Sequence, residues 1–339
     1  MSQIFETDVA VIGAGPVGLF AIFQCGMLGF KSVCIDSLDQ IGGQCTALYP
    51  EKPIYDIPAE PSISGAALIE QLEKQASPFA PLYILGQQVV AVAGNAGAFI
   101  LTTSKDNMIK AKSIIIAAGA GAFGPHRPPL DNLEIFEGKS VFYAVRHRDL
   151  FKSKKIVIAG GGDSAVDWAN SLAEMAEKIY VVHRRDKFRA APASLDALNN
   201  HVSKGIVELI TPYQLSALHG QNGMLEQVTV ADMDGHQKIL DADVLLPFFG
   251  LSTALGPIAD WGLNLNRSQI TTTHGTAETN TKGIYAVGDI ATYPDKLRLI
   301  LTGFGDAAHA AHAIYKQIHP DIPLHFEYST TKGIKPSPC

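Results

Sequence analysis

A repeated glycine pattern constrains this chain more than any other feature of its sequence. A short apolar strand leads into G-x-G-x-x-G at Gly13–Gly18, and another leads into G-x-G-x-x-A at Gly160–Ala165. Each pattern is followed by a stretch of helical length and then by a second apolar strand. The second strand of each unit ends at Asp36, 23 residues after the first glycine, and at Arg184, 24 residues after it. This is the length of a βαβ unit, so the sequence predicts two dinucleotide folds in one chain.

The order of the remaining elements predicts that one of these folds is inserted into the other. Apolar strands at Lys112–Gly119 and Gly283–Asp289 flank the second glycine unit, and the later strand resembles the chemistry of the first unit. We therefore expect an α/β protein with two Rossmann-like domains and chain crossings near residues 120 and 250. In this division, residues 1–119 and 250–339 form one domain and residues 120–249 form the inserted one.

Two further segments complete the expected organisation. Gly65–Pro81 has a helical pattern. The residues from about 326 onward are polar, contain proline and are too few to bury a core alone, so we expect a C-terminal tail.

Composition excludes several classes of protein. The 339 residues are more than one hydrophobic core usually supports. A formal net charge of -6 argues against nucleic acid as a general partner. The four cysteines are too few and too irregularly spaced for a disulfide scaffold or a zinc site, which favours a cytoplasmic protein without a metal. Val9–Phe30 is apolar enough to suggest a membrane span, but its glycines and Pro16 favour a strand, a turn and a helix.

The first glycine loop has the residues that a dinucleotide diphosphate requires. Gly13 allows a tight turn, Gly15 allows the backbone to approach a pyrophosphate, and Gly18 allows the helix to pack closely on the strand. The amide of Val17 lies at the positive N-terminus of that helix. Asp36 ends the next strand, where a carboxylate binds ribose hydroxyls and repels a 2′-phosphate. An FAD-type cofactor is therefore expected here.

The second loop ends in cations where the first ends in Asp36. His183, Arg184 and Arg185, with Arg189 beyond, would attract the 2′-phosphate of NADP, and the planar guanidinium suits phosphate oxygens. The alternative is a solvated basic loop. The NADP(H) site is expected to include the loop and helix residues Gly160, Gly162, Asp163, Ser164 and Ala165.

Several motifs together resemble a known family. GAGPVG (13–18), IGGQ (41–44), GGGDSAVD (160–167), HRRDKFRA (183–190) and YAVGD (285–289) are similar to the pyridine nucleotide disulfide oxidoreductases of the low-molecular-weight thioredoxin reductase type. Two further segments, Leu48–Asp56 and Glu327–Gly333, resemble the thioredoxin-reductase-like ferredoxin-NADP reductases, which are homodimeric flavoproteins.

This resemblance implies further residues of the flavin site. Gln44 would hydrogen-bond the flavin, Tyr49 would stack on the isoalloxazine, and Asp289 would bind the ribityl hydroxyls. The other residues that the resemblance implies are Val89 at the adenine, Phe123 beside the flavin, and Tyr328 and Thr330 of the tail acting on the partner subunit. Tyr49 and Tyr328 would therefore take part in catalysis by stacking. No acid or base residue is required, because hydride transfer between nicotinamide and flavin depends on alignment.

The cysteines decide which electron acceptor the resemblance implies. The chain has no C-x-x-C pair, and Ala144 and His147 stand in the two cysteine positions of the thioredoxin reductase motif. Disulfide reduction is therefore excluded, and electrons that arrive as hydride from NADPH must leave the flavin directly. The resemblance favours single-electron transfer to ferredoxin or flavodoxin, and the basic window Arg146–Lys155 could dock an acidic carrier.

Two other functions remain open from the residues alone. An NAD(P)H oxidase or a quinone reductase would share every nucleotide motif and differ only in its acceptor. A non-catalytic flavin redox sensor is a third class, although Arg184 and Arg185 argue against it because a sensor needs no NADP site. Neither nucleic acid nor a membrane is an expected partner.

Overall fold

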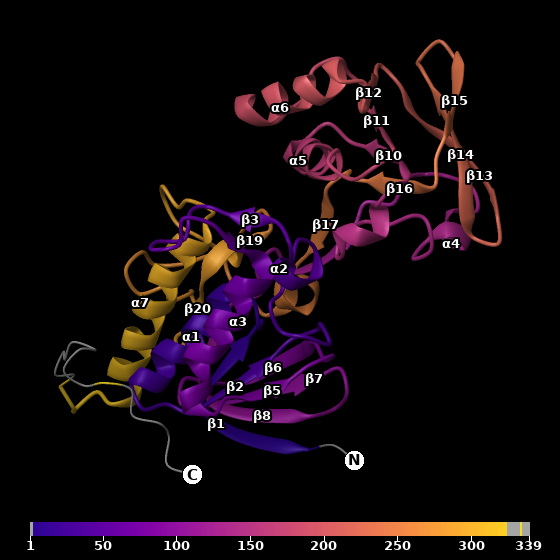
Figure 1. Ribbon diagram of the computed structural model, residues 1–339. Coiled ribbons are helices and arrows are strands. Elements are labelled where there is room, and N and C mark those ends of the chain that lie inside the picture. Colours follow the sequence, from indigo (N-terminus) through magenta and orange to yellow (C-terminus); the bar gives the residue numbers. More distant parts are fainter. Residues whose placement is uncertain (1–2, 324–332, 334–339) are drawn as a thin grey trace. The chain divides into compact units, whose positions relative to one another are not determined.

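The computed structural model describes residues 3–323 and 333, and its chain divides into two compact units. The first unit combines Met1–Phe123 with Thr253–Cys339, and the second comprises Gly124–Ser252 (Figure 1). The chain passes between them along β9 (Ala122–Pro125) and β17 (Leu251–Ala254), which pair with each other. The predicted α/β class and the insertion of one fold into the other are therefore observed.

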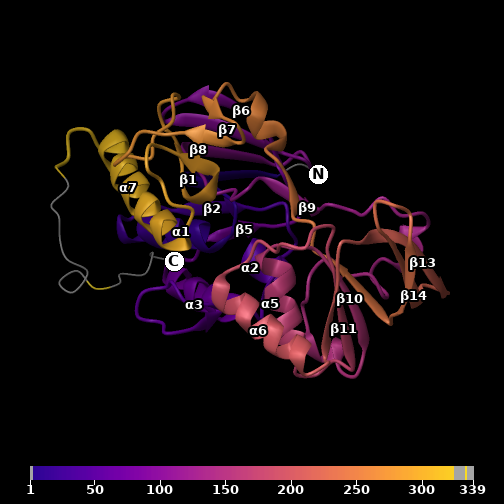
Figure 2. The same cartoon turned by 90° about the horizontal axis from the view of Figure 1, so that it is seen from above.

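The first unit is built on one sheet in which β1 and β8 are central. The strands follow the order β5-β2-β1-β8-β7-β6, and β20 pairs with the second half of β8 (Figure 2). Pairing is parallel among β5, β2, β1, β8 and β20, whereas β6, β7 and β8 form an antiparallel meander. The strands are β1 (Ile4–Ile12), β2 (Ser32–Ile35), β5 (Leu82–Ile84), β6 (Val89–Asn95), β7 (Ala98–Thr103), β8 (Met108–Ile116) and β20 (Ile284–Ala286).

Alternation along β1 divides the core of this unit into two layers. Val9 and Val11 pack with three helices that lie side by side on one face of the sheet, while Ala10 and Ile12 pack into a second cluster on the other face. All four are buried, as expected for a central parallel strand covered on both faces. The helices are α1 (Pro16–Met27), α3 (Gly65–Ala76) and α7 (Ile300–Ile318).

Shorter elements complete the first unit. They are α2 (Gln44–Ala47), β3 (Pro53–Ile54), β4 (Ile63–Ser64), η1 (Ser77–Phe79), η3 (Gly256–Asp260), β18 (Leu265–Asn266), β19 (Gln269–Thr271), η4 (Gly288–Ile290) and β21 (Ala291–Thr292).

The helix expected across Gly65–Pro81 is shorter in the structure. It ends at Ala76, and the short turn η1 follows. The physical reason is Pro78, which has no N–H to donate to the preceding turn of the helix. The segment Val9–Phe30 forms the end of β1, a turn and α1, as predicted. None of the described helices is both long enough and apolar enough to span a bilayer.

The second unit has a four-stranded parallel sheet with the order β12-β11-β10-β16. One face packs against α5 and α6, and the other against the antiparallel sheet β13-β14-β15. The elements are α4 (Leu133–Phe136), η2 (Arg148–Phe151), β10 (Lys155–Ala159), α5 (Asp163–Leu172), β11 (Lys178–Val182), α6 (Pro192–Ser203), β12 (Val207–Ile210), β13 (Gln214–Gln221), β14 (Met224–Ala231), β15 (Gln237–Asp241) and β16 (Val244–Pro247).

A buried ion pair ties α7 to the loop after β20. Asp306 of α7 pairs with Lys296, and their side chains are 6% and 3% exposed. Asp306 also accepts hydrogen bonds from the Gly288 amide at 3.1 Å and from the Tyr293 hydroxyl at 2.9 Å. The Lys296 ammonium lies 4.8 Å from the centre of the Tyr293 ring. Through the hydrogen bond to the Gly288 amide, these contacts fix the backbone of η4 against α7.

We expect Lys296→Met to lower the free energy of unfolding by about 3–5 kcal/mol, because it leaves the Asp306 carboxylate buried without its counter-charge. The double variant Lys296→Met with Asp306→Leu should regain part of that loss, since no buried charge remains. The matched control is Lys112→Met, which breaks a pair with Asp8 whose side chains are 50% and 22% exposed and should cost less than about 1 kcal/mol. Urea unfolding measures all three, and equal losses for the two single variants would contradict the assignment.

Candidate functional site

The glycine loop between β1 and α1 is so crowded that only glycine fits at two of its positions. A Cβ atom on Gly13 would lie 2.4 Å from the carbonyl oxygen of Ala117, and a Cβ on Gly18 would lie 1.9 Å from that of Gly13. Gly13 also has a φ of +109°, which side chains of L-residues rarely adopt. The first turn of α1 is therefore held directly against the end of its own sheet.

Gly15 differs from its neighbours because the space in front of it is open. No protein atom lies within 4 Å of the position that its Cβ would take. Gly15 is the N-cap of α1, Pro16 follows, and no side chain caps the helix. The free amides of the first turn and the helix dipole therefore favour an anionic group beside Gly15.

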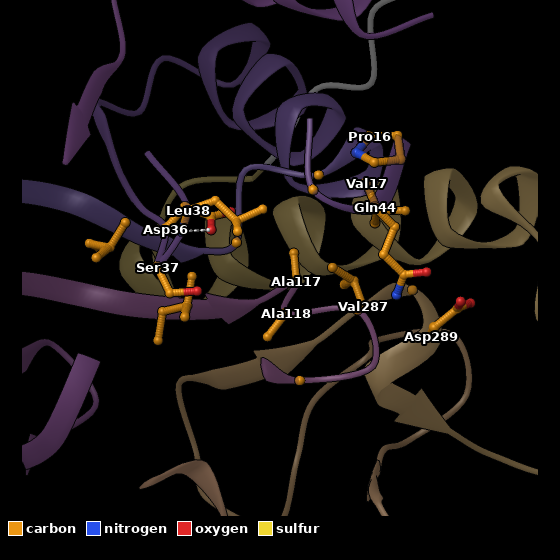
Figure 3. A pocket seen from close by; sticks show the side chains of 18 of the residues that line it. Pro16, Val17, Asp36, Ser37, Leu38, Gln44, Ala117, Ala118, Val287 and Asp289 are labelled. Carbon is orange, nitrogen blue, oxygen red and sulfur yellow. Dashed lines mark hydrogen bonds between the residues drawn. The ribbon is translucent and has the colours of Figure 1, made fainter. Parts of the chain in front are cut away.

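Asp36 marks one end of the pocket that lies beside this loop (Figure 3). Its carboxylate accepts hydrogen bonds from the Ala14 amide at 2.6 Å and from the Leu38 amide at 2.9 Å. Burial raises the pKa of Asp36 above its ordinary value of 3.8, and the amides of Leu38, Ala14 and Ser37 partly offset that rise. The amides fix the orientation of the carboxylate while leaving it further acceptor capacity for a hydroxyl ligand.

Gln44 and Asp289 lie together toward the other end of the same pocket (Figure 3). Gln44 begins α2 after Gly43, whose Cβ would lie only 3.1 Å from the Cα of Gly15. Asp289 lies in η4, directly after β20, and its side chain is exposed. The pocket thus offers an amide and a carboxylate at one end and Asp36 at the other.

Tyr49 lines the pocket next to a buried thiol. The Cys45 thiol donates a hydrogen bond of 3.7 Å to the Tyr49 hydroxyl. Burial, followed by the proximity of Cys45, raises the pKa of Tyr49 far above its ordinary value. Tyr49 is therefore a neutral phenol at all ordinary pH values, and its contribution is a ring surface and a hydroxyl.

Most of the predicted flavin-site residues meet in this pocket. The lining includes Gly13, Gly15, Val17, Asp36, Gln44, Tyr49, Val89 and Asp289. Gly18 does not line it, because its role is the close contact with Gly13. Phe123 lies in β9 (Ala122–Pro125), and its side chain is outside the described part of the structure. Tyr328 and Thr330 lie outside the described residues.

Other lining residues were not anticipated. They are Ile12, Pro16, Ile35, Ser37, Leu38, Gly43, Cys45, Gln87, Gln88, Ala117, Ala118, Gly119, Gly121, Leu255, Ile258, Val287, Gly288 and Ile300. Many of them follow the carboxyl ends of parallel strands, which is the edge of a sheet where ligands bind. The Ala117–Gly119 segment after β8 could have been found from that rule.

The second unit repeats the arrangement with different chemistry. A Cβ on Gly160 would lie 2.6 Å from the carbonyl oxygen of Phe248, whereas Gly162 faces open space, as Gly15 does. Gly161 lies beneath the imidazole of His183, whose ring atoms would be 2.3 Å from an added Cβ. Gly162 is the uncapped N-cap of α5. A second phosphate-type site therefore lies beside this loop.

Three arginines surround this second pocket. Arg184, Arg185 and Arg189 are exposed and line it together with His183. The Arg189 amide donates to the Gly161 carbonyl at 2.7 Å, which holds the basic segment against the glycine loop. Within the described part of the chain, no carboxylate forms an ion pair with Arg184 or Arg185. Their charges are free to bind an anion.

Three other predicted NADP-site residues lie in the first turn of α5 and do not line the pocket. Asp163, Ser164 and Ala165 form the first turn of α5, and the Asp163 carboxylate accepts a hydrogen bond of 3.1 Å from the Ala191 amide. Sequence reasoning missed the remaining lining residues, which are Pro128, Pro129, Ala159, Gly161, Val182, Tyr213, Gln214, Leu215, Phe248, Phe249 and Gly250.

The three cysteines in the described part of the chain cannot act as a redox pair. Cys25, Cys34 and Cys45 are buried and free. Burial raises the pKa of all three thiols, that of Cys25 to about 12. None of them is a ready thiolate at neutral pH, and thiolate is the form that exchanges disulfides.

The fold and the two pockets define a protein with two dinucleotide-binding folds, one inserted into the other. The model of the pyridine nucleotide-disulphide oxidoreductase family matches residues 7–314. The chain belongs to this family.

Full-length relatives and solved structures agree with that assignment. Proteins named ferredoxin–NADP reductase include one from Acidiphilium cryptum, 57% identical over 98% of this chain and 99% of its own. Another, from Gluconacetobacter diazotrophicus, is 59% identical over 97% of this chain and 96% of its own. The crystal structure of T. acidophilum thioredoxin reductase is similar in fold, with a TM-score of 0.77 and 23% identity over 92% of this chain and 99% of that one. The crystal structure of Lactococcus lactis thioredoxin reductase also has a TM-score of 0.77, with 24% identity, and the match covers 93% of this chain and 99% of that one.

His183 should report on the charge of the second pocket. Burial and then the charges of Arg184, Arg185 and Arg189 lower its pKa below the ordinary 6.5, against a hydrogen bond to the Lys187 backbone that raises it. The unfolded chain therefore binds the proton more readily than the folded chain does. The contribution of His183 to the free energy of unfolding accordingly decreases as the pH falls below 6.5. We expect NMR titration to place the midpoint below 6.5 and 2′,5′-ADP to raise it, because bound phosphate offsets the arginines. A midpoint at or above 6.5 without ligand would contradict this.

Proposed function

We propose that this protein is an FAD-dependent ferredoxin–NADP reductase, with FAD in the first unit and NADP(H) in the second. The observation that carries the proposal is the contrast between two otherwise similar loop sites. One ends in the amide-anchored carboxylate of Asp36. The other ends in Arg184 and Arg185, which form no ion pair with a carboxylate of the described residues. Ribose hydroxyls suit the first, and a 2′-phosphate suits the second.

The first pocket fits FAD in its chemistry. Gly15 leaves a space that a Cβ would fill, beside uncapped amides suited to a pyrophosphate. Asp36 would hold the ribose, Val89 the adenine, and Gln44, Tyr49 and Asp289 the flavin end. Residues 1–119 and 250–339 would form this domain, and residues 120–249 the NADP domain. Gly162 and the arginines would hold the NADP phosphates.

The chain's own residues act by binding and orientation. The bound flavin would accept two electrons as a hydride from NADPH and pass them on one at a time. Tyr49, a neutral phenol, would provide a flat surface without supplying a proton. Asp36 and Arg184 would select the two nucleotides and place each in its own unit. Catalysis then depends on alignment rather than on an acid or a base.

The relatives' name and the cysteines support ferredoxin or flavodoxin as the acceptor. Buried, high-pKa thiols give no relay to a disulfide. The window Arg146–Lys155 is less basic than its composition indicates, because Arg148 contacts Glu174 and the Ser171 carbonyl, and Lys155 contacts Asp241. Arg146 and Lys152 stay exposed and could attract an acidic carrier. An NAD(P)H oxidase or quinone reductase would differ only in the acceptor.

We also propose a cytoplasmic homodimer, in which Tyr328 and Thr330 contribute to the flavin site of the partner subunit. The sequence resemblance supports the dimer and the role of the tail, and the few, irregularly spaced cysteines support the cytoplasmic location. Analytical ultracentrifugation gives the oligomeric state, and mixed dimers of Tyr328→Ala with an active-site variant would show whether the tail acts across subunits.

The decisive experiment is anaerobic mixing of the flavin-loaded protein with NADPH and then with oxidised ferredoxin. We expect the flavin absorbance to bleach with NADPH and to recover as ferredoxin is reduced. Oxygen, a quinone and thioredoxin replace ferredoxin in parallel runs, and the rates assign the acceptor. Faster transfer to oxygen or quinone would overturn the ferredoxin assignment, whereas a flavin that NADPH does not bleach would favour a sensor.

Two glycine variants test which unit binds which nucleotide. Gly15 and Gly162 have ordinary φ values of -71° and -99°, so alanine fits both backbones and its methyl group enters the open space. We expect Gly15→Ala to weaken FAD binding about ten-fold or more, a loss of at least ~1.4 kcal/mol, and Gly162→Ala to do the same for NADP⁺ only. Fluorescence and calorimetric titrations measure both. Gly305→Ala, on α7 with open space around it, is the control and should bind both normally.

A further inference from the structure

The strand order of the second unit gives its pocket two distinct sides. β10 carries the glycine loop and lies between β11 and β16, and β12 lies beyond β11. His183 and the arginines follow β11, so the ribose phosphate side is the β11–β12 side. Phe248 and Phe249 follow β16 and border the pocket from the opposite side of β10.

Tyr213 is the aromatic residue that follows β12 on the ribose phosphate side. Its amide donates a hydrogen bond of 3.1 Å to the His183 carbonyl, which places it directly beside the basic segment. Tyr213 lines the same pocket as Arg184 and Arg185, and it is partly buried against the core cluster that covers one face of the sheet. A nucleotide whose 2′-phosphate lies on these arginines would have its base close to this ring.

The Tyr213 ring also has a lysine ammonium near its centre. The Lys238 ammonium of β15 lies 4.5 Å from the ring centre, within cation–π distance. Lys238 is exposed and is not among the residues that line the pocket. The cation therefore contacts the ring without itself lining the pocket.

We propose that Tyr213, supported by Lys238, is the platform on which the adenine of NADP(H) stacks. The inference rests on the proposed function, because it assumes NADP(H) in this pocket. Every purine has an apolar face that stacks on an aromatic ring, and such contacts are worth about 1–3 kcal/mol by substitution. Tyr213 therefore binds the adenosine half without reading the 2′-phosphate, which separates its role from that of Arg184 and Arg185.

The test compares nucleotides that differ by one recognition element. Binding of 2′,5′-ADP to the flavin-loaded protein is measured by calorimetry, and the KM values for NADPH, NADH and reduced nicotinamide mononucleotide are measured by flavin bleaching. The variants are Tyr213→Leu, Tyr213→Phe, Arg184→Ala and, as a control, Tyr180→Leu. Tyr180 is a partly buried tyrosine of β11 whose ring also lies near a lysine ammonium but does not line the pocket. Thermal unfolding and flavin content confirm that each variant is folded and loaded.

We expect Tyr213→Leu to weaken 2′,5′-ADP binding roughly 5- to 100-fold and Tyr213→Phe to keep it within about two-fold of wild type. The KM for NADH and for NADPH should rise by the same factor in Tyr213→Leu, and that for reduced nicotinamide mononucleotide should not change. Arg184→Ala should raise only the KM for NADPH, and Tyr180→Leu should leave 2′,5′-ADP binding unchanged, because Tyr180 does not line the pocket.

Two outcomes would overturn the inference while leaving the proposed function intact. In one, wild type and Tyr213→Leu bind 2′,5′-ADP equally. In the other, Tyr213→Leu affects NADPH but not NADH, which would assign the residue to the phosphate. A wild-type protein that neither binds 2′,5′-ADP nor is bleached by NADPH would overturn the proposed function itself.

Discussion

The contact between the first turn of α1 and the end of its own sheet is the constraint on which the first unit depends. Gly18 packs against the Gly13 carbonyl, and Gly13 packs against the Ala117 carbonyl, at distances that exclude any side chain. This contact brings the N-terminus of α1 to the carboxyl edge of the sheet, where the Asp36, Ala117 and Val287 segments also end. The pocket therefore forms where the carboxyl ends of the strands meet the N-terminus of a helix. Polar side chains that follow these strand ends lie in the pocket.

The second unit uses the same backbone device for a different ligand chemistry. Gly160 packs on the Phe248 carbonyl and Gly162 faces open space, so the two loops differ little in shape. They differ in electrostatics. Asp36 is bound to two backbone amides, whereas the arginines are exposed, and burial followed by their charges lowers the pKa of His183 beside them. The residues that follow the second strand of each unit would thus repel a 2′-phosphate in the first unit and attract one in the second.

The sequence predicts those features of the site that depend on local patterns, and it misses those that depend on distant partners. The glycine loops, Asp36 and the arginine segment could be found because spacing along one βαβ unit determines their positions. The Lys296–Asp306 pair behind Gly288 could not, since nothing near either residue indicates that both are buried. Tyr213 is similar: its proximity to His183 follows from the pairing of β12 with β11, and its support comes from Lys238 on another sheet. The end of α3 at Ala76 does have a local signal in the sequence, which is Pro78 two residues later.

A shared fold does not carry the chemistry of disulfide reduction into this chain. Thioredoxin reductases share its fold at a TM-score of 0.77, but identities of 23% and 24% leave the reaction to the side chains. Ala144 and His147 stand where the thioredoxin reductase motif has cysteines, and Cys45, which lines the first pocket, is 1% exposed with a raised pKa. Its thiol is engaged with the Tyr49 hydroxyl, so this position contributes packing beside the ring. The cysteines of the described residues offer no thiol pair beside this pocket, so in the proposed function the acceptor would be a protein or a small molecule that reaches the flavin itself.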